Sequence, residues 1–170
     1  MRLIFVLAAL ALAAPAAAQE AAPVCPADAK PIPGHLAGWT HPAPLAAAAS
    51  AADAGKAALM VGQAADAALP STGDVKFALR PEKPGGSVSH GGVFSVDIDK
   101  PGAYTVALST GAWIDVVRDG KALESSAHGR GPACTSLRKM VQFQMQPGRY
   151  LIQISANAEP RIGIMVAANP

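Results

Sequence analysis

Charged and aromatic side chains are scarce in this sequence. Charged residues make up 15% of the 170 residues and aromatic residues 5%, and the formal net charge at pH 7 is only +2. Binding to nucleic acid depends on clustered basic side chains, and anionic lipid surfaces attract polybasic segments. No such cluster occurs along the chain, so we expect neither a nucleic-acid partner nor electrostatic attachment to a membrane.

Long hydrophobic runs are also lacking, apart from one at the N-terminus. Residues 3–14 are apolar, follow the positive charge of Arg2, and end at Pro15 before three alanines. A membrane-spanning helix needs about 20 apolar residues, whereas the apolar region of a secretory signal peptide needs about 7–15. We therefore predict that residues 1–18 are a signal peptide, although a buried N-terminal helix is the alternative. The protein would then be periplasmic or secreted, with no membrane span in its mature chain.

Cysteine is nearly absent, since the chain has only Cys25 and Cys134. Exported proteins fold in oxidising compartments, where two cysteines can pair. A disulfide between them would close a loop of about 110 residues and contribute about 4 kcal/mol of stability if it acts through chain entropy. Two buried thiols or a shared metal ion are the alternatives, but neither cysteine has another cysteine or a histidine at the usual ligand spacing. We predict a Cys25–Cys134 disulfide.

No segment of the predicted mature chain shows the hydrophobic stripe of a long amphipathic helix. Residues 19–55 contain six prolines, which favour extended and turn conformations. We predict that this range is an irregular Pro/Ala-rich N-terminal arm, tied to the rest of the protein through Cys25. Its alanine-rich part, residues 46–54, suits a short helical turn.

From residue 56 to residue 170 the sequence consists of short alternating segments separated by glycine and proline. In the first clear segment, Phe94, Val96 and Ile98 alternate with polar residues, which is the period of a half-buried strand. Asp119-Gly120 lies between two later segments and predicts a two-residue type I′ turn. Further alternating segments are residues 103–109, 112–118, 140–146, 149–155 and 161–167. We therefore predict an all-β domain over residues 56–170, folded as an antiparallel, jelly-roll-like β-sandwich.

One unit of this pattern occurs twice: an alternating strand is followed by Pro-Gly, one further residue and Tyr. The matching residues are Phe94-Ser95-Val96, Pro101-Gly102 and Tyr104 in the first copy, and residues 141–145, Pro147-Gly148 and Tyr150 in the second. The unit resembles the bacterial pre-peptidase C-terminal type of domain, where one strand ends in a glycine turn and the next opens with an aromatic residue. This resemblance supports the sandwich, and we expect both copies to be corners of it without a catalytic role.

A second resemblance covers much of residues 80–140. The stretches that carry it are "RPEKPGGSVSHGG", "GAWIDVVRDGKAL", "AHGRGPAC" and "LRKM". They are similar to a group of short exported bacterial proteins of unassigned role, which are sometimes catalogued as homogentisate 1,2-dioxygenase. That catalogue name implies an iron(II) site of two histidines and one carboxylate.

The chain would have to build such an iron site from its four histidines, which are His35, His41, His90 and His128. No histidine is followed two residues later by aspartate, glutamate or another histidine, so the closely spaced ligands typical of a facial triad are not evident. An iron dioxygenase therefore remains the alternative function. The residues themselves predict no metal site and no cofactor.

Two other kinds of chemistry are only weakly indicated. Asp97 and Asp99 share a strand face and could offer oxygen ligands, but Ca²⁺ needs six to eight of them and no acidic loop adjoins the pair. Ser87 and Ser89 precede His90, but the Gly-x-Ser-x-Gly pattern of a nucleophile elbow is absent. We expect a solvated strand face and an ordinary loop at these positions, and we predict no catalytic residue.

A binding surface is the best-supported functional interpretation of the sequence. The candidate residues come from the Asp119-Gly120 hairpin and from glycine-rich loops, and they are His90, Trp113, Arg118, His128 and Arg130. Loops on a rigid β-scaffold often carry recognition, and an aromatic ring beside a cation can hold a planar or anionic group. The alternative is that Trp113 packs in the core and the arginines are ordinary surface charges.

We conclude that the sequence predicts an exported, non-catalytic binding or envelope-accessory module. Its partner would be a small molecule, a carbohydrate or an envelope protein. A purely structural protein, with the arm contacting a partner, is a further possibility. The uncharged stripe of Gln142, Gln144 and Gln146 is expected to face water.

Overall fold

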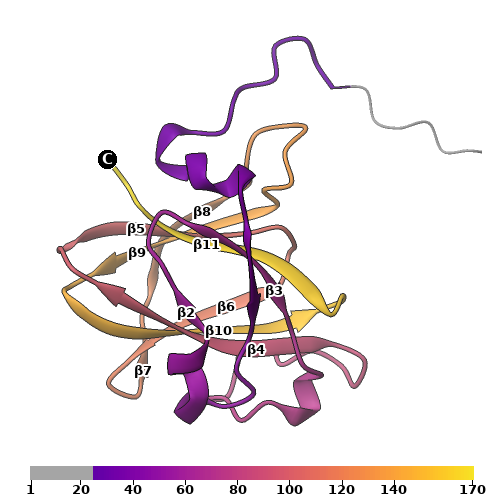
Figure 1. The fold of residues 1–170 in the computed structure, drawn as a ribbon, viewed down its shortest axis with the longest axis vertical. Helices are drawn as coiled ribbons and strands as arrows, with labels where there is room; N and C mark the ends of the chain where they lie inside the picture. Colours follow the sequence, from indigo (N-terminus) through magenta and orange to yellow (C-terminus); the bar gives the residue numbers. More distant parts are fainter. Residues whose placement is uncertain (1–24) are drawn as a thin grey trace, which may run out of the picture.

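The alternating segments form two β-sheets that pack face to face in the computed structural model of the chain, which describes residues 25–170 (Figure 1). The predicted signal peptide, residues 1–18, lies outside the described residues. The six-stranded sheet has the order β1 (Ala43–Ala46), β3 (Ala64–Ala68), β11 (Arg161–Ala168), β5 (Gly102–Leu108), β9 (Lys139–Met145) and β8 (Ser125–Gly129). The five-stranded sheet has the order β2 (Ala58–Leu59), β4 (His90–Ile98), β10 (Gly148–Asn157), β6 (Trp113–Arg118) and β7 (Lys121–Ala122). The predicted all-β sandwich is confirmed.

The sheets are mixed rather than purely antiparallel, which corrects one part of the prediction. Strand β1 runs parallel to β3, and β2 runs parallel to β4, at the same lateral edge of the sandwich. Strand β1 lies within the range predicted as an irregular arm, so this part of the chain joins the sheet. The described part of that range also contains two short 3₁₀ helices, η1 (Gly34–Thr40) and η2 (Ala51–Lys56), the second of which ends one residue beyond it; a third, η3 (Thr72–Asp74), follows β3.

The core between the sheets is built from the alternating apolar residues that the sequence predicted. Phe94 and Val96 of β4 and Ile152 and Ile154 of β10 are at most 1% exposed, and they face the buried residues of β5, β9 and β11. Burying one such side chain fully stabilises a protein by about 1.5–3 kcal/mol. The polar residues between them point to the outer faces of the sheets.

The repeated Pro-Gly-x-Tyr unit forms two equivalent corners. The first copy connects β4 to β5 and the second connects β9 to β10, so each carries the chain from one sheet to the other. In both, the buried tyrosine hydroxyl donates to the carbonyl four residues upstream: Tyr104 to Lys100 at 2.8 Å and Tyr150 to Gln146 at 3.0 Å. This is the arrangement of a tyrosine corner, which fixes the bend between packed sheets.

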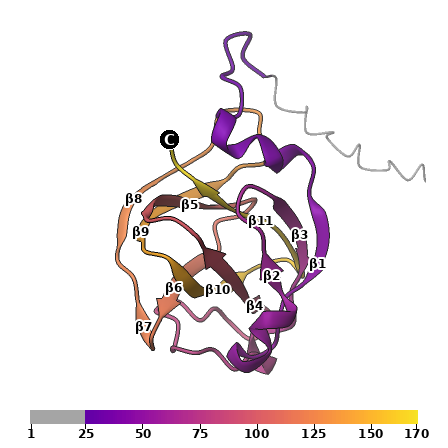
Figure 2. The ribbon, with the colours of Figure 1, turned by 60° about the vertical axis from the view of Figure 1, so that its left-hand side comes forward.

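Irregular segments cover part of the outer face of each sheet. On the six-stranded sheet, Leu36 and Trp39 of η1 pack with Leu137 and Met165 in a second apolar cluster, and η1 lies beside β11 (Figure 2). The predicted disulfide is confirmed: it joins Cys25 to Cys134, with their Cα atoms 5.7 Å apart, and so links the N-terminal arm to this cover.

On the five-stranded sheet, residues 76–89 form the cover. The side chain of Gln153 is fully buried in β10, accepts hydrogen bonds from the backbone amides of Ala78 (2.6 Å) and Leu79 (3.0 Å), and donates one to the Leu79 carbonyl (3.1 Å). Ser155 donates to the carbonyl of Lys83 at 2.8 Å. Two buried polar side chains of one strand therefore hold this loop in place.

Candidate functional site

The five residues predicted as a ligand surface do not form one cluster. His90 opens β4, Trp113 and Arg118 are the first and last residues of β6, His128 lies in β8 of the other sheet, and Arg130 follows it. Among residues 25–170, no hydrogen bond or ion pair joins any two of the five. The five residues therefore lie in separate surroundings.

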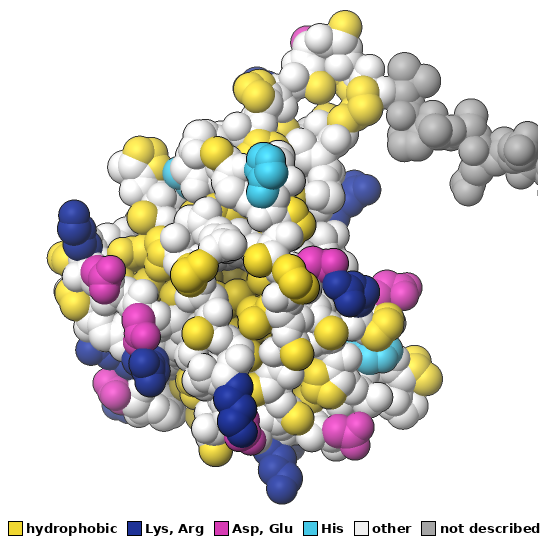
Figure 3. Space-filling view, in the orientation of Figure 1, with side chains coloured by type: hydrophobic (Ala, Val, Ile, Leu, Met, Phe, Trp, Pro, Cys, Tyr) yellow, Lys and Arg dark blue, Asp and Glu magenta, His cyan; other side chains and the backbone are white. Residues whose placement is uncertain are grey.

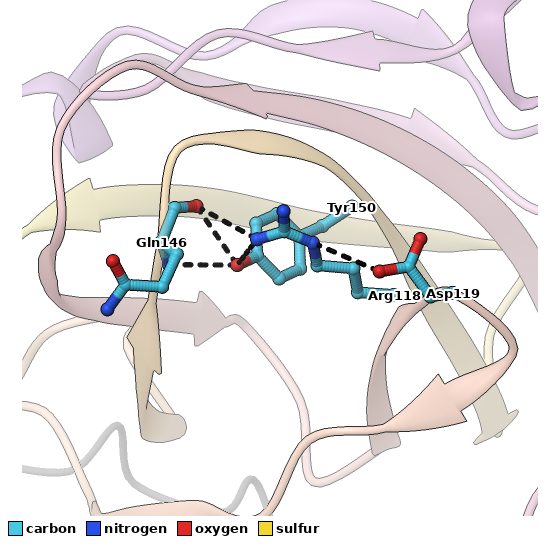
Figure 4. A network of polar contacts seen from close by, with 4 residues as sticks. All are labelled: Arg118, Asp119, Gln146 and Tyr150. Atoms are coloured by element: carbon cyan, nitrogen blue, oxygen red, sulfur yellow. Dashed lines mark hydrogen bonds and ion pairs between the residues drawn. The ribbon is translucent and has the colours of Figure 1, made fainter.

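Arg118 belongs to the second tyrosine corner (Figure 4). Its Nη1 donates to the Tyr150 hydroxyl at 2.8 Å, its guanidinium lies 5.1 Å from the centre of the Tyr150 ring, and it forms a 3.5 Å ion pair with Asp119. Asp119 and Gly120 both have positive φ, 51° and 71°, as the predicted type I′ turn requires. The role of Arg118 in the structure is to lock this corner to the hairpin.

The histidines and Arg130 lack a common centre. His128 and Arg130 are exposed at the outer edge of the six-stranded sheet, and the Nδ1 atom of His90 is buried without a hydrogen-bond partner in the described chain. No three His, Cys, Asp or Glu side chains among residues 25–170 are placed to hold one metal ion. These residues therefore offer no ligand set for the iron dioxygenase alternative.

The other two chemical candidates have structural partners. Both carboxylate oxygens of Asp97 accept hydrogen bonds from Arg149 at 2.9 Å, and this contact holds the pKa of Asp97 below its usual value. The Ser89 hydroxyl donates to the Gly86 carbonyl at 2.7 Å within its own loop, and is also 3.0 Å from the Thr72 hydroxyl. These contacts explain both residues without calcium or a nucleophile.

Trp113 is surrounded by charged side chains that come from separate segments of the chain. Its ring is partly exposed, and the ammonium groups of Lys83 and Lys139 lie 4.9 Å and 5.3 Å from the ring centre. Its indole Nε1 donates to Asp115 Oδ1 at 2.9 Å. We call Trp113, Asp115, Lys83 and Lys139 the Trp113 platform.

Three separate parts of the chain build the Trp113 platform. Alternation along β6 buries Ile114 and Val116 in the core, so that Trp113 and Asp115 point to the outer face of the five-stranded sheet. Lys83 is placed by the loop that Gln153 and Ser155 hold. Lys139 opens β9 of the other sheet, and its ammonium donates to the Ala112 carbonyl at 2.7 Å.

The charges of the platform are partly desolvated. Burial raises the pKa of Asp115, the nearby Glu82 carboxylate adds to this rise, and the hydrogen bond from Trp113 and the neighbouring Gln153 amide act in the opposite direction. Burial lowers the pKa of Lys139, as does the positive charge of Lys83. The Oδ2 atom of Asp115 is buried without a hydrogen-bond partner among the described residues. The platform therefore combines an aromatic ring, two cations and a buried carboxylate oxygen.

Sequence reasoning found Trp113 but missed the other three residues of the platform. Asp115 could have been inferred, because a residue two positions along a strand shares the same face. Nothing in the local sequence relates Lys83 or Lys139 to Trp113, because a loop cover and a strand of the opposite sheet bring them there.

Two apolar hollows lie on another part of the molecule. One, of about 120 Å³, is lined by Trp39, Ala64 and Gly163 among others, and one of about 180 Å³ by Pro44, Leu59 and Met60 among others. Figure 3 shows hydrophobic side chains gathered near the middle of this face, and Met60 is 63% exposed. Neither hollow includes a residue of the Trp113 platform.

Comparison with known proteins does not place the chain in a family: no protein-family model and no curated protein matches it. In the part of the chain that the structure describes, no helix has the length and apolar character needed to cross a membrane.

Proposed function

We propose that this protein is an exported, non-catalytic binding module whose ligand site is the Trp113 platform. The observation that carries the proposal is the partly exposed indole with two ammonium groups within 5.3 Å of its centre. Beside it lies a buried carboxylate oxygen of Asp115 that has no hydrogen-bond partner among residues 25–170. The N-terminal sequence and the disulfide support export, since disulfides persist in oxidising compartments.

The chemistry of the platform favours a ligand that carries a negative charge. Two ammonium groups near one another repel, and an anion between them relieves that repulsion and gains charge-assisted hydrogen bonds. The aromatic face adds an apolar contact for a ring or chain next to the charged group. An envelope-accessory role would follow if the ligand belongs to the cell envelope.

Intrinsic fluorescence tests the proposal, because the chain has only two tryptophans. The oxidised mature chain is titrated with small carboxylates and phosphates and with neutral sugars. We expect the anions to change the emission in the wild type and in the Trp39→Phe variant, and to have no such effect in Trp113→Phe. If no anion perturbs Trp113, the proposal is wrong.

The same preparation separates this function from the iron dioxygenase alternative. Its iron content is measured, and it is assayed for homogentisate turnover with added iron(II). One iron per chain together with homogentisate turnover would show that the protein is the dioxygenase and not a non-catalytic binding module. A metal-free chain that binds anions at Trp113 supports the proposal.

A further inference from the structure

We infer that the ligand of the Trp113 platform is an acidic polysaccharide whose sugar rings carry carboxylate groups. The inference rests on the proposed function and goes further, because it names the chemical class from three separate contacts. The platform would make these contacts through the indole face of Trp113, the ammonium pair of Lys83 and Lys139, and the buried acceptor of Asp115. Each matches a different group on a uronic acid ring.

The indole supplies the stacking face. The C–H bonds on one side of a pyranose ring carry a small positive charge, and they pack on the electron-rich face of an aromatic ring. Asp115 holds the indole through Nε1, so the orientation of the ring is set before any ligand arrives. A preorganised aromatic side chain loses little conformational entropy on binding.

The two lysines supply the carboxylate site, and their mobility differs. Lys139 is partly buried and its ammonium is held by the Ala112 carbonyl at 2.7 Å. Lys83 is exposed, and its ammonium has no hydrogen-bond or ion-pair partner among residues 25–170. Lys83 can therefore move off the ring face towards a ligand carboxylate while Lys139 stays fixed.

Asp115 supplies the acceptor for a sugar hydroxyl. Its Oδ1 accepts from Trp113, and its buried Oδ2 has no partner among the described residues. A buried polar atom without a partner is rare in folded proteins and costs stability. Because this oxygen is buried, a hydroxyl next to the carboxylate of a uronic acid ring would donate to it only after the side chains that cover it move aside, whereas a simple anion such as phosphate at neutral pH offers mainly acceptors.

The position of the platform favours a polymer over a small enclosed molecule. Sites for small molecules usually enclose most of the ligand in a concave apolar pocket. The two hollows of about 120 Å³ and 180 Å³ lie elsewhere, whereas the platform is at the surface beside an exposed loop. An extended chain can place one ring on Trp113 and continue on both sides.

Calorimetry and Trp113 fluorescence with four probes test this inference. The probes are polygalacturonate, neutral dextran, dextran sulfate and 4-hydroxybenzoate. We expect polygalacturonate to bind and dextran not to bind. Lys83→Gln and Asp115→Asn should each weaken polygalacturonate binding about tenfold or more, the loss expected for one charge-assisted hydrogen bond.

Lys121→Gln is the matched control, because Lys121 is exposed in β7 of the same sheet but outside the platform. It should leave the affinity unchanged, and thermal unfolding checks that each variant is folded. If dextran sulfate binds as tightly as polygalacturonate and Lys121→Gln weakens the binding of both, the binding is non-specific electrostatic attraction and the inference is wrong.

The remaining outcomes distinguish the inference from the proposed function. Binding of 4-hydroxybenzoate at Trp113 without binding of polygalacturonate would show that the ligand is not an acidic polysaccharide, while the proposed anion-binding function would stand. If the wild type binds no anion at all, both the inference and the proposed function are wrong.

Discussion

The two corner tyrosines have different numbers of hydrogen bonds, and this difference can be measured. The Tyr150 hydroxyl contacts Arg118 as well as the amide and the carbonyl of Gln146. Within residues 25–170, the Tyr104 hydroxyl bonds only to the Lys100 carbonyl. We expect Tyr104→Phe to lower the free energy of unfolding by about 1 kcal/mol and Tyr150→Phe by about 2–3 kcal/mol, because the latter leaves more polar groups without partners. Urea unfolding gives both values, and an equal or larger loss in Tyr104→Phe would contradict this account of the corners.

Asp115 and Asp97 should affect stability with opposite dependence on pH. Burial raises the pKa of Asp115, so the folded chain binds more protons than the unfolded chain between the ordinary value of 3.8 and the raised one. The stability from this group is thus present below 3.8 and is lost as the pH rises through the raised pKa. Arg149 lowers the pKa of Asp97, so its contribution is present above 3.8 and is lost as the pH falls through the lowered pKa.

The measurement is the free energy of unfolding of Asp115→Asn and Asp97→Asn, each minus that of the wild type, across the acidic range. With rising pH the difference should become more positive for Asp115→Asn and more negative for Asp97→Asn. Two differences that slope in the same direction would show that the environment of Asp115 is not as described.

At the scale of elements, Gln153 determines whether the loop of residues 76–89 covers its sheet. Gln153→Leu removes all three bonds to Ala78 and Leu79, and we expect it to lower the free energy of unfolding by about 2 kcal/mol. Hydrogen exchange should show faster exchange at the amides of residues 78 and 79, with β10 still protected. Because the same loop carries Lys83, the variant should also bind anions more weakly.

The control for this element is Gln144→Leu, since Gln144 is exposed in β9 on the other sheet. It should leave exchange at residues 78 and 79 unchanged. Faster exchange there in both variants, or protection retained in Gln153→Leu, would mean that the loop is held by other contacts.

The elements also show which parts of the fold the sequence could predict. Strands β4, β10 and β11 were predictable because their large side chains alternate, and the type I′ turn was predictable because Asp-Gly adopts positive φ. Strands β1 and β3 were missed because they are rich in alanine, which has little β-propensity, and the sheet itself determines their conformation.

The glutamines and the Trp113 platform also show what local sequence patterns cannot predict. The sequence treats Gln142, Gln144 and Gln153 alike as polar strand residues, yet Gln153 is fully buried because a loop crosses its sheet. For the same reason, Trp113 and, by strand alternation, Asp115 were predictable from the sequence, whereas Lys83 and Lys139 were not. Contacts between distant segments have no local sequence pattern.

At the scale of the whole molecule, the free edges of the sheets are protected against pairing with other chains. Strands β2 and β7 have only two residues each, β1 contains Pro44, and the register of β8 shifts between Ser125 and Ala127. Short strands, prolines and bulges are the usual ways to prevent sheet edges from associating. Binding of a partner by strand addition is therefore disfavoured, which agrees with the proposal of a ligand site on a sheet face, where the Trp113 platform lies.

The disulfide could stabilise the whole protein in two ways: by restricting the unfolded chain or by holding η1 on the sheet. Removing the disulfide distinguishes them. It closes a loop between residues 109 positions apart. If it acts by restricting the unfolded chain, the Cys25→Ser/Cys134→Ser double variant should lose up to about 4–5 kcal/mol, which for a chain of this size lowers the midpoint of thermal unfolding by roughly 10–15 °C. The wild type treated with a reductant should show the same loss, and the double variant should not respond to reductant.

The folded structure should survive this change, because η1 has contacts of its own. Leu36 is fully buried, Trp39 is 7% exposed, and the Trp39 indole donates to Ser136 at 2.8 Å. In a Trp113→Phe background, the emission of Trp39 should therefore be the same with and without the disulfide at low temperature. A shift of that emission towards the solvent-exposed value would show that the disulfide holds η1 on the sheet, and a stability loss below about 1 kcal/mol would show that the unfolded chain is little restricted by it.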